Sequence, residues 1–380
     1  MLRHHKGPWI EYIVIAIATI ILYLRQVYLY PMINPDGVTY LQAAAMYTEN
    51  GLHGVLALGE QAKWPFYPII IGWIHQIFGL NIWTAQRWFD GFCLTSSALC
   101  FLAVARLLSQ HPRQGIWAIL LWISWHAYVK WWPQVIRDHG FMLCLLLSLY
   151  SYYYYVLKRN TAWAFAWSAS IFLGVFFRIE GIFYALLIPF FSIFFFRHQT
   201  FREKLGCCLQ LHYLSIIISL ICGGLFITHK LSMNSFRFAY IWQELSLYAS
   251  TVTSEFMRRY HTMAQYIFYR ENPCPSCALV SGYFALFLAY VINHINLVII
   301  PVFFMIRRTL SHRKLFILAP IFMPYLSIAL ALPLLFFIEY AFLNGRYLLP
   351  FGVLTLLYAA IFLPHIIDKL TKKIESFLSE

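Results

Sequence analysis

The segment from Asn34 to Tyr40, Asn-Pro-Asp-Gly-Val-Thr-Tyr, places a carboxylate where a first apolar span ends. Pro35 suits the first turn of a helix, and Asn34 suits its cap. Asp36 would then lie near the positive end of the helix dipole and stay ionised, with Tyr40 one turn later on the same face. A carboxylate in this place can take the proton of a substrate hydroxyl. Asp36 is therefore our candidate catalytic base, and the structural alternative is an acid that only stabilises the first helical turn.

Three further ionisable clusters are predicted to reach the same membrane boundary. They are Arg137-Asp138-His139, Arg178-Ile179-Glu180-Gly181, and Glu339 with Asn344-Gly345-Arg346-Tyr347. A charge deep in a bilayer costs about 2.5 to 3.5 kcal/mol on insertion scales, so such groups line a cavity, pair with each other or lie at the interface. Their predicted convergence with Asp36 indicates one polar site.

Each cluster also has a structural interpretation. Arg137 with Asp138, and Arg178 with Glu180, fit a local ion pair or a snorkelling anchor as well as they fit a substrate contact. Arg346 follows a flexible Asn-Gly pair, where its guanidinium can bind a lipid phosphate through two hydrogen bonds. The alternative for Arg346 is an anchor at the membrane surface.

The composition predicts the fold class. At 61% hydrophobic and 11% charged residues, this 380-residue chain is too apolar for a soluble globule, and we expect an all-α polytopic membrane protein. About ten stretches are apolar enough to span: 10 to 30, 84 to 108, 114 to 129, 138 to 157, 161 to 177, 182 to 196, 211 to 229, 284 to 305, 315 to 338 and 347 to 367.

The charges predict the orientation. With the N-terminus inside, 16 of the 28 Lys and Arg residues fall in short loops on one face, as the positive-inside rule requires, and nine of the 15 acids fall on the other. The net charge of +13 therefore indicates topology, and we expect a lipid bilayer and no nucleic acid as partner. The first span is interpreted as a retained signal anchor, because no small-residue cleavage site follows it.

Residues 1–380 are predicted to form one membrane domain. Two outer segments are long enough to build a site, 31–83 and 230–283, and residues 368–380 form a charged cytoplasmic tail. An apolar run that ends at Gly79 is too short to span, so we expect it to lie in the interface. We expect an integral protein of a bacterial inner (plasma) membrane, whose site faces the periplasm or exterior.

The cysteines and histidines predict no metal site. Cys274 and Cys277 have redox-motif spacing, but they lie in an outer loop and are interpreted as a short disulfide. The other six cysteines lie in or beside predicted spans and are interpreted as small packing residues. His139 has no metal-ligand pattern around it and is interpreted as structural.

Five motifs together resemble the C-type (GT-C) glycosyltransferases that use polyprenyl-phosphate sugars, including the protein O-mannosyltransferase and aminoarabinose transferase branches. They are Asp36-Gly37-Val38-Thr39-Tyr40, Trp64-Pro65-Phe66-Tyr67-Pro68, Arg137-Asp138, Arg178-Ile179-Glu180-Gly181 and Arg346-Tyr347-Leu348-Leu349-Pro350. The motifs stand in family order over most of the chain. Two features depart from the family: Pro35 and Gly37 flank Asp36 where a second acid often stands, and no large soluble C-terminal domain follows.

The resemblance implies a GT-C helix bundle and transfer of a hexose or pentose from a polyprenyl-phosphate donor. The acceptor hydroxyl would belong to a glycan, a lipid or a protein on the extracytoplasmic side. Asp36 would be the base and Asp138 the second catalytic acid. Arg346 would bind the phosphate, supported by Arg137 and Arg178, and Glu180, Tyr40 and Tyr347 complete the predicted substrate contacts. The resemblance leaves the use of a divalent metal open.

The chemistry fits this assignment, since loss of phosphate from an anomeric carbon needs cations on the phosphate and a carboxylate near the attacking hydroxyl. One acid without a clear second nucleophile predicts inversion at the anomeric carbon.

Two alternative functions belong to other classes of protein. A transporter or flippase for a lipid-linked or anionic solute would use the same arginines, but it favours charges at mid-membrane in corresponding halves. A scaffold subunit of an envelope-assembly complex would not need Asp36.

Overall fold

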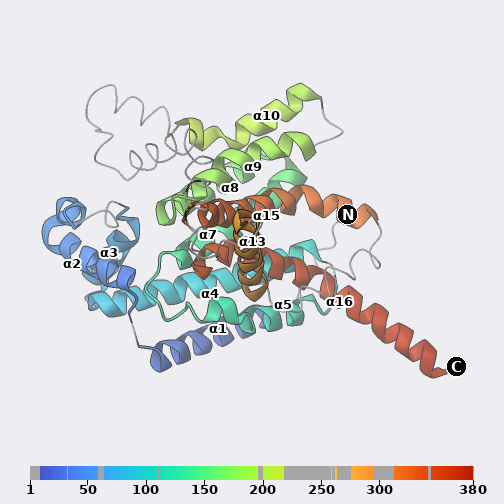
Figure 1. Cartoon of the computed structure of the whole chain (residues 1–380), viewed down its shortest axis with the longest axis horizontal. Helices are drawn as coiled ribbons and strands as arrows, with labels where there is room; N and C mark the ends of the chain where they lie inside the picture. The colour runs from blue at the N-terminus through green and yellow to red at the C-terminus, as the bar shows by residue number, and fades with distance from the viewer. Residues whose placement is uncertain are drawn as a thin grey trace.

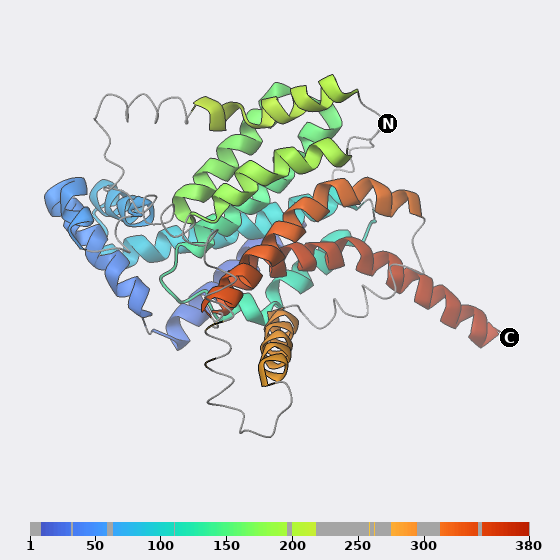
Figure 2. The same cartoon turned by 45° about the horizontal axis from the view of Figure 1, so that its top comes forward.

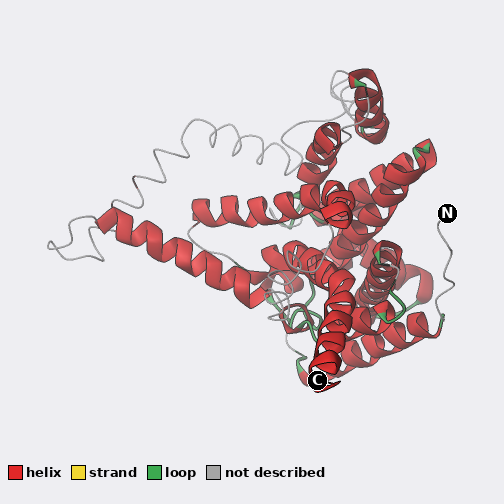
Figure 3. Cartoon of the chain, turned by 90° about the vertical axis from the view of Figure 1, so that its right-hand side faces the viewer, coloured by secondary structure: helices red, strands yellow, loops and turns green. Residues whose placement is uncertain are grey.

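The computed structural model describes residues 9–31, 33–58, 64–109, 111–195, 200–217, 258, 262, 275–294, 312–340 and 344–379. All regular structure in these residues is helical (Figures 1 and 3). The elements are α1 (Ile10–Leu29), α2 (Pro35–Leu56), α3 (Phe66–Phe78), α4 (Ile82–Leu108), α5 (Gln114–Ile123), α6 (His126–Val129), α7 (Asp138–Lys158), α8 (Thr161–Phe177), α9 (Gly181–Phe195), α10 (Phe201–Leu211), α13 (Pro275–His294), α15 (His312–Tyr340), the 3₁₀ helix η3 (Gly345–Leu348) and α16 (Leu349–Ser379).

Five helical segments are long and apolar enough to cross a membrane: Ile10–Leu29, Ile82–Leu108, Asp138–Lys158, Ile321–Ile338 and Gly345–Phe377. The predicted all-helical membrane protein is confirmed at this level. Shorter apolar helices lie at Phe66–Phe78, Gln114–Ile123, Thr161–Phe177 and Gly181–Phe191. The count of ten spans stays a prediction, because residues 218–257 and 295–311 lie outside the described part of the chain.

The described helices give the bundle two chemically different ends (Figure 2). At one end α2 and α3 follow the end of α1, near the start of α7 and the end of α8. At the other end Arg106 of α4 contacts Glu11 of α1 at 2.6 Å, and His111 contacts Asp368 of α16 at 2.7 Å. The predicted cytoplasmic tail continues α16 as a helix to Ser379.

The stretch 114–129, predicted as one span, is two helices. α5 ends at Ile123 and α6 begins at His126, with Trp125 in a non-helical conformation (ψ 77°). The Ser124 hydroxyl donates to the Leu121 carbonyl at 3.3 Å, and the Trp125 indole donates to the His294 carbonyl at 3.1 Å. The indole bond holds the break against α13, which runs across the direction of α15 and α16 (Figure 2).

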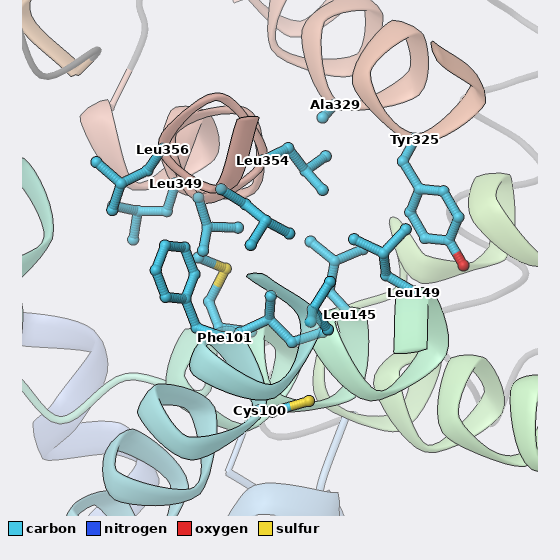
Figure 4. Close-up of a cluster of buried hydrophobic side chains, with 14 of the residues drawn as sticks. Cys100, Phe101, Leu145, Leu149, Tyr325, Ala329, Leu349, Leu354 and Leu356 are labelled. Atoms are coloured by element: carbon cyan, nitrogen blue, oxygen red, sulfur yellow. The ribbon is translucent and has the colours of Figure 1, made fainter. Parts of the chain in front are cut away.

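The core lies between α4, α7, α15 and α16. Phe101, Leu145, Leu149, Tyr325 and Leu354 face one another there (Figure 4), and each is at most 1% exposed. Five cysteines in the described residues are free and buried, as predicted for packing residues: Cys93, Cys100, Cys144, Cys207 and Cys208. Cys274 lies outside the described residues, as does the side chain of Cys277, so their disulfide stays a prediction.

The contact between α7 and α8 depends on a glycine. A Cβ built on Gly140 would lie 2.5 Å from Cε1 of Phe177, closer than side-chain atoms approach each other. Phe177 has little room to move, because its ring also contacts Phe66 (5.1 Å between centroids) and Phe89 (6.0 Å). Gly140 therefore allows α7 to approach the end of α8 closely.

We predict that Gly140→Ala lowers the free energy of unfolding by about 1 to 3 kcal/mol, because the added methyl overpacks this contact. Gly206→Ala is the matched control, since a Cβ at Gly206 of α10 meets nothing within 4 Å. The control should stabilise by about 0.5 to 1 kcal/mol through helix propensity. Thermal unfolding of the purified protein in detergent measures both, and equal midpoints for the two variants would contradict the proposed packing role.

Candidate functional site

Asp36 and Arg346, which are 310 positions apart in sequence, form an ion pair. Nη1 of Arg346 donates to Oδ2 of Asp36 at 2.6 Å, and the two side chains are 22% and 21% exposed. Asp36 is in the first turn of α2, directly after Pro35, as predicted. Arg346 lies in η3, where the Asn344 side chain accepts a hydrogen bond from the Arg346 backbone N–H at 3.2 Å.

Arg178 is the buried centre of a second group of charges. It is 5% exposed, and its guanidinium donates to Asp138 and, at 2.7 Å, to Oε1 of Glu180. The same guanidinium lies 4.8 Å from the centroid of the Tyr347 ring, and Arg346 lies 5.6 Å from that centroid. Tyr347 therefore joins the two ionic groups through cation-π contacts.

Tyr40 and Arg137 complete the cluster. Tyr40 is 4% exposed. Burial raises the pKa of Tyr40, while the nearby charge of Arg137 lowers it and that of Asp36 raises it. Among the described residues, Arg137 forms no ion pair within 4 Å, and no hydrogen bond of the Tyr40 hydroxyl is seen. All the site residues predicted from the sequence thus come together in one place, which we call the ionic cluster: Asp36, Tyr40, Arg137, Asp138, Arg178, Glu180, Arg346 and Tyr347.

The charges of the ionic cluster balance. Three arginines face three carboxylates, and each carboxylate has an arginine partner. Burial alone would raise the pKa of Glu180, but the guanidinium of Arg178 lowers it to about 2. Arg346 in turn donates from its guanidinium to the carboxylate of Asp36. The pairing with Arg178 therefore holds Glu180 in its charged form.

Local contacts fix the start of α2 over the loop before α7. Asn34 occupies the N-cap position of α2, as predicted. Its side chain does not cap the helix, because its Oδ1 accepts a hydrogen bond from the Val135 N–H at 3.1 Å instead. A Cβ on Gly37 would lie 2.7 Å from Cβ of Val135, so only glycine permits this approach. The flanking Trp64 donates from its indole to the Val175 carbonyl at 3.1 Å, which ties the segment before α3 to α8.

Other candidates from the sequence lie apart from the ionic cluster or outside the described residues. His139 is fully buried, with Nδ1 3.2 Å from the Tyr128 hydroxyl, in agreement with a structural role. The side chain of Glu339 and nearly all of the outer segment 230–274 lie outside the described residues. Within the part that is described, no three His, Cys, Asp or Glu side chains gather as a metal site.

Sequence reasoning missed a buried carboxylate beside the site. Asp90 of α4 is fully buried and accepts hydrogen bonds from Tyr67 and Gln86. The available signal was the acid itself, the single Asp or Glu in the predicted span 84 to 108, where a buried carboxylate is costly unless it has a role.

No protein-family model matches the chain. A search of curated proteins finds no match either. The ionic cluster itself is therefore what indicates a function. Such a cluster can bind an anionic group through guanidinium donors and can offer a carboxylate to a hydroxyl proton.

We predict that removing Arg178 destabilises the protein strongly. Arg178→Met leaves Asp138 as a buried carboxylate without its partner, which costs about 3 to 5 kcal/mol. Adding Asp138→Asn to that variant should recover part of the loss. Arg106→Met is the control, because it breaks a more exposed pair with Glu11. Chemical unfolding in detergent measures all three, and equal losses for Arg178→Met and Arg106→Met would contradict the burial argument.

We also predict a pH dependence from Glu180. Its folded pKa of about 2 lies below the ordinary 4.5, so its ion pair stabilises the protein fully above about pH 4.5 and is lost as the pH falls toward 2. The difference in unfolding midpoint between the native protein and Glu180→Gln should therefore shrink over that range. Glu49→Gln, which removes an exposed carboxylate of α2, is the control for the loss of one negative charge. A difference that stays constant from pH 5 to 2.5 would contradict the assignment.

Proposed function

We propose that this protein is a membrane glycosyltransferase that uses a polyprenyl-phosphate sugar donor and transfers the hexose or pentose to an acceptor hydroxyl. One observation carries the proposal: Asp36 and Arg346 meet at 2.6 Å within a cluster of arginines and carboxylates at one end of a helical bundle. The reaction needs a carboxylate near the acceptor hydroxyl and a cation on the leaving phosphate, and this cluster offers both.

In the proposed reaction, the acceptor oxygen attacks the anomeric carbon and the bond from that carbon to the phosphate oxygen breaks. Asp36 takes the acceptor proton, and the polyprenyl phosphate leaves with the bonding electrons. The transition state has oxocarbenium character, so the proton is needed late and an ionised Asp36 is a sufficient base. A single displacement predicts inversion at the anomeric carbon.

The three arginines have different roles in this proposal. Arg346 is paired with Asp36, so a donor phosphate that draws on Arg346 would release the carboxylate toward the acceptor. Arg137 forms no ion pair among the described residues and is open to a phosphate oxygen. Arg178 is buried between Asp138 and Glu180, so it supports the site from beneath.

The distribution of basic residues supports the placement of this site on the extracytoplasmic side. Arg106, Arg113, Lys158 and Arg159 lie at the end of the bundle opposite the ionic cluster. Under the positive-inside rule, that opposite end faces the cytoplasm. A bacterial inner membrane and an envelope glycan, lipid or protein acceptor remain part of the proposal.

The test uses cells that lack the protein, complemented with the native chain or with Asp36→Asn at matched membrane abundance. Mass spectrometry of polyprenyl-phosphate sugars and envelope glycans should show that Asp36→Asn behaves like the deletion, since loss of a general base costs about 100-fold or more in rate. One lipid-linked sugar should accumulate and one glycan should lack that sugar.

Asp368→Asn is the matched control, because it neutralises an ion-paired carboxylate at the opposite end of the bundle. It should complement fully. Full complementation by Asp36→Asn would contradict the base assignment and favour a scaffold. Accumulation of donor on the cytoplasmic leaflet alone would favour a flippase.

A further inference from the structure

Asp90 lies beneath the ionic cluster and has no cation within ion-pair distance among the described residues. Its carboxylate is fully buried in α4. The Tyr67 hydroxyl lies 3.0 Å from Oδ1 and 3.1 Å from Oδ2, and the Gln86 amide also donates to Oδ2. A buried acid in a membrane helix is costly, so it is retained where it has a specific task.

The first contact beyond this network leads to the candidate base. Tyr67 of α3 is 1% exposed, and its ring meets the Tyr40 ring edge-on, with 5.5 Å between centroids and 79° between planes. Tyr40 stands one helical turn after Asp36 on α2. Asp90 therefore fixes the Tyr67 ring, and the Tyr67 ring supports the part of α2 that carries Asp36.

A second contact leads to the buried arginine. The Tyr67 ring lies 5.9 Å from Phe89, and Phe89 stacks with Phe177 at 6.0 Å. Phe177 is the last residue of α8 and directly precedes Arg178. Ring contacts thus lead from Tyr67 to Tyr40, near Asp36, and through Phe89 to Phe177, next to Arg178.

We propose that Asp90 is a positioning residue for the ionic cluster, acting through its hydrogen bond with Tyr67 to set the place of Tyr40 and of the first turns of α2. Tyr67 lies on α3, a 13-residue helix in the connection between α2 and α4. The hydrogen bond from its hydroxyl to Asp90 pins α3 to the long helix α4. The catalytic part of this inference rests on the proposed glycosyl transfer, and the positioning part does not.

The experiment combines a structural readout with an activity readout on the full chain. Fluorotyrosine incorporated at Tyr40 reports the surroundings of that ring by ¹⁹F NMR in detergent. Sugar transfer is measured in membranes that contain the lipid-linked donor. The variants are Tyr67→Phe, which removes the donor hydroxyl, and Asp90→Leu, which removes both oxygens that accept it.

Tyr325→Phe is the matched control. Tyr325 is as buried as Tyr67, and its hydroxyl also has two partners, the Trp167 indole at 2.8 Å and the Ser148 hydroxyl at 3.1 Å. These partners lie on α7 and α8, and the rings that Tyr325 contacts are Tyr152 and Tyr184. The control therefore removes an equivalent buried hydroxyl without touching the proposed support.

We expect Tyr67→Phe to shift or broaden the Tyr40 resonance and to lower kcat by about tenfold or more with little change in KM, since small displacements of a catalytic group have effects of this order. Asp90→Leu should change the resonance and the rate in the same direction, and Tyr325→Phe should change neither. An unchanged Tyr40 resonance in Tyr67→Phe would overturn the proposal, and so would equal changes in Tyr325→Phe. If the native protein transfers no sugar, the proposed function fails, while the ¹⁹F result still decides whether Asp90 and Tyr67 position Tyr40.

Discussion

Mutual neutralisation of guanidinium and carboxylate groups at one end of the bundle is the constraint on which the rest of this structure depends. Arg178 is almost wholly buried, and a buried charge without partners would cost several kcal/mol. Its partners Asp138 and Glu180 come from two different turns of the chain, so the start of α7, the end of α8 and the start of α9 must meet for either turn to be stable. Arg346 imposes the same requirement on η3 and α2, because its partner is Asp36.

Glycine and aromatic residues let the backbone meet this requirement. Gly37 and Gly140 allow two close approaches that any side chain would block, one to Val135 and one to Phe177. The aromatic rings of Tyr67, Phe89 and Phe177 pack in series beside the ionic cluster. The Tyr347 ring has both kinds of contact. It stacks on Phe336, with 4.3 Å between centroids, and it forms cation-π contacts with the guanidinium groups of Arg178 and Arg346.

The sequence predicted the membership of the ionic cluster better than its internal pairing. Alternating spans bring residues from distant segments to the same boundary, so Asp36, Asp138, Arg178 and Arg346 could be placed together from hydropathy alone. The local pair of Arg178 with Glu180 was one of two interpretations of the sequence, whereas the pairs Arg178–Asp138 and Arg346–Asp36 depend on packing between helices, which no local pattern encodes. Asp90 was missed for the same reason, because its partners Tyr67 and Gln86 are united only by the packing of α3 on α4.

The pairing also limits how the proposed reaction can begin. The three arginines and three carboxylates of the ionic cluster balance in charge, and Asp36 is paired with the guanidinium of Arg346. A donor phosphate that enters the site therefore adds a net negative charge. Arg137, which forms no ion pair within the described residues, can receive that charge without the loss of an existing partner. Arg346 can then share its donors between the phosphate and Asp36, which leaves the carboxylate partly released beside the acceptor. On this argument the resting ion pair keeps Asp36 in place and ionised until a donor binds.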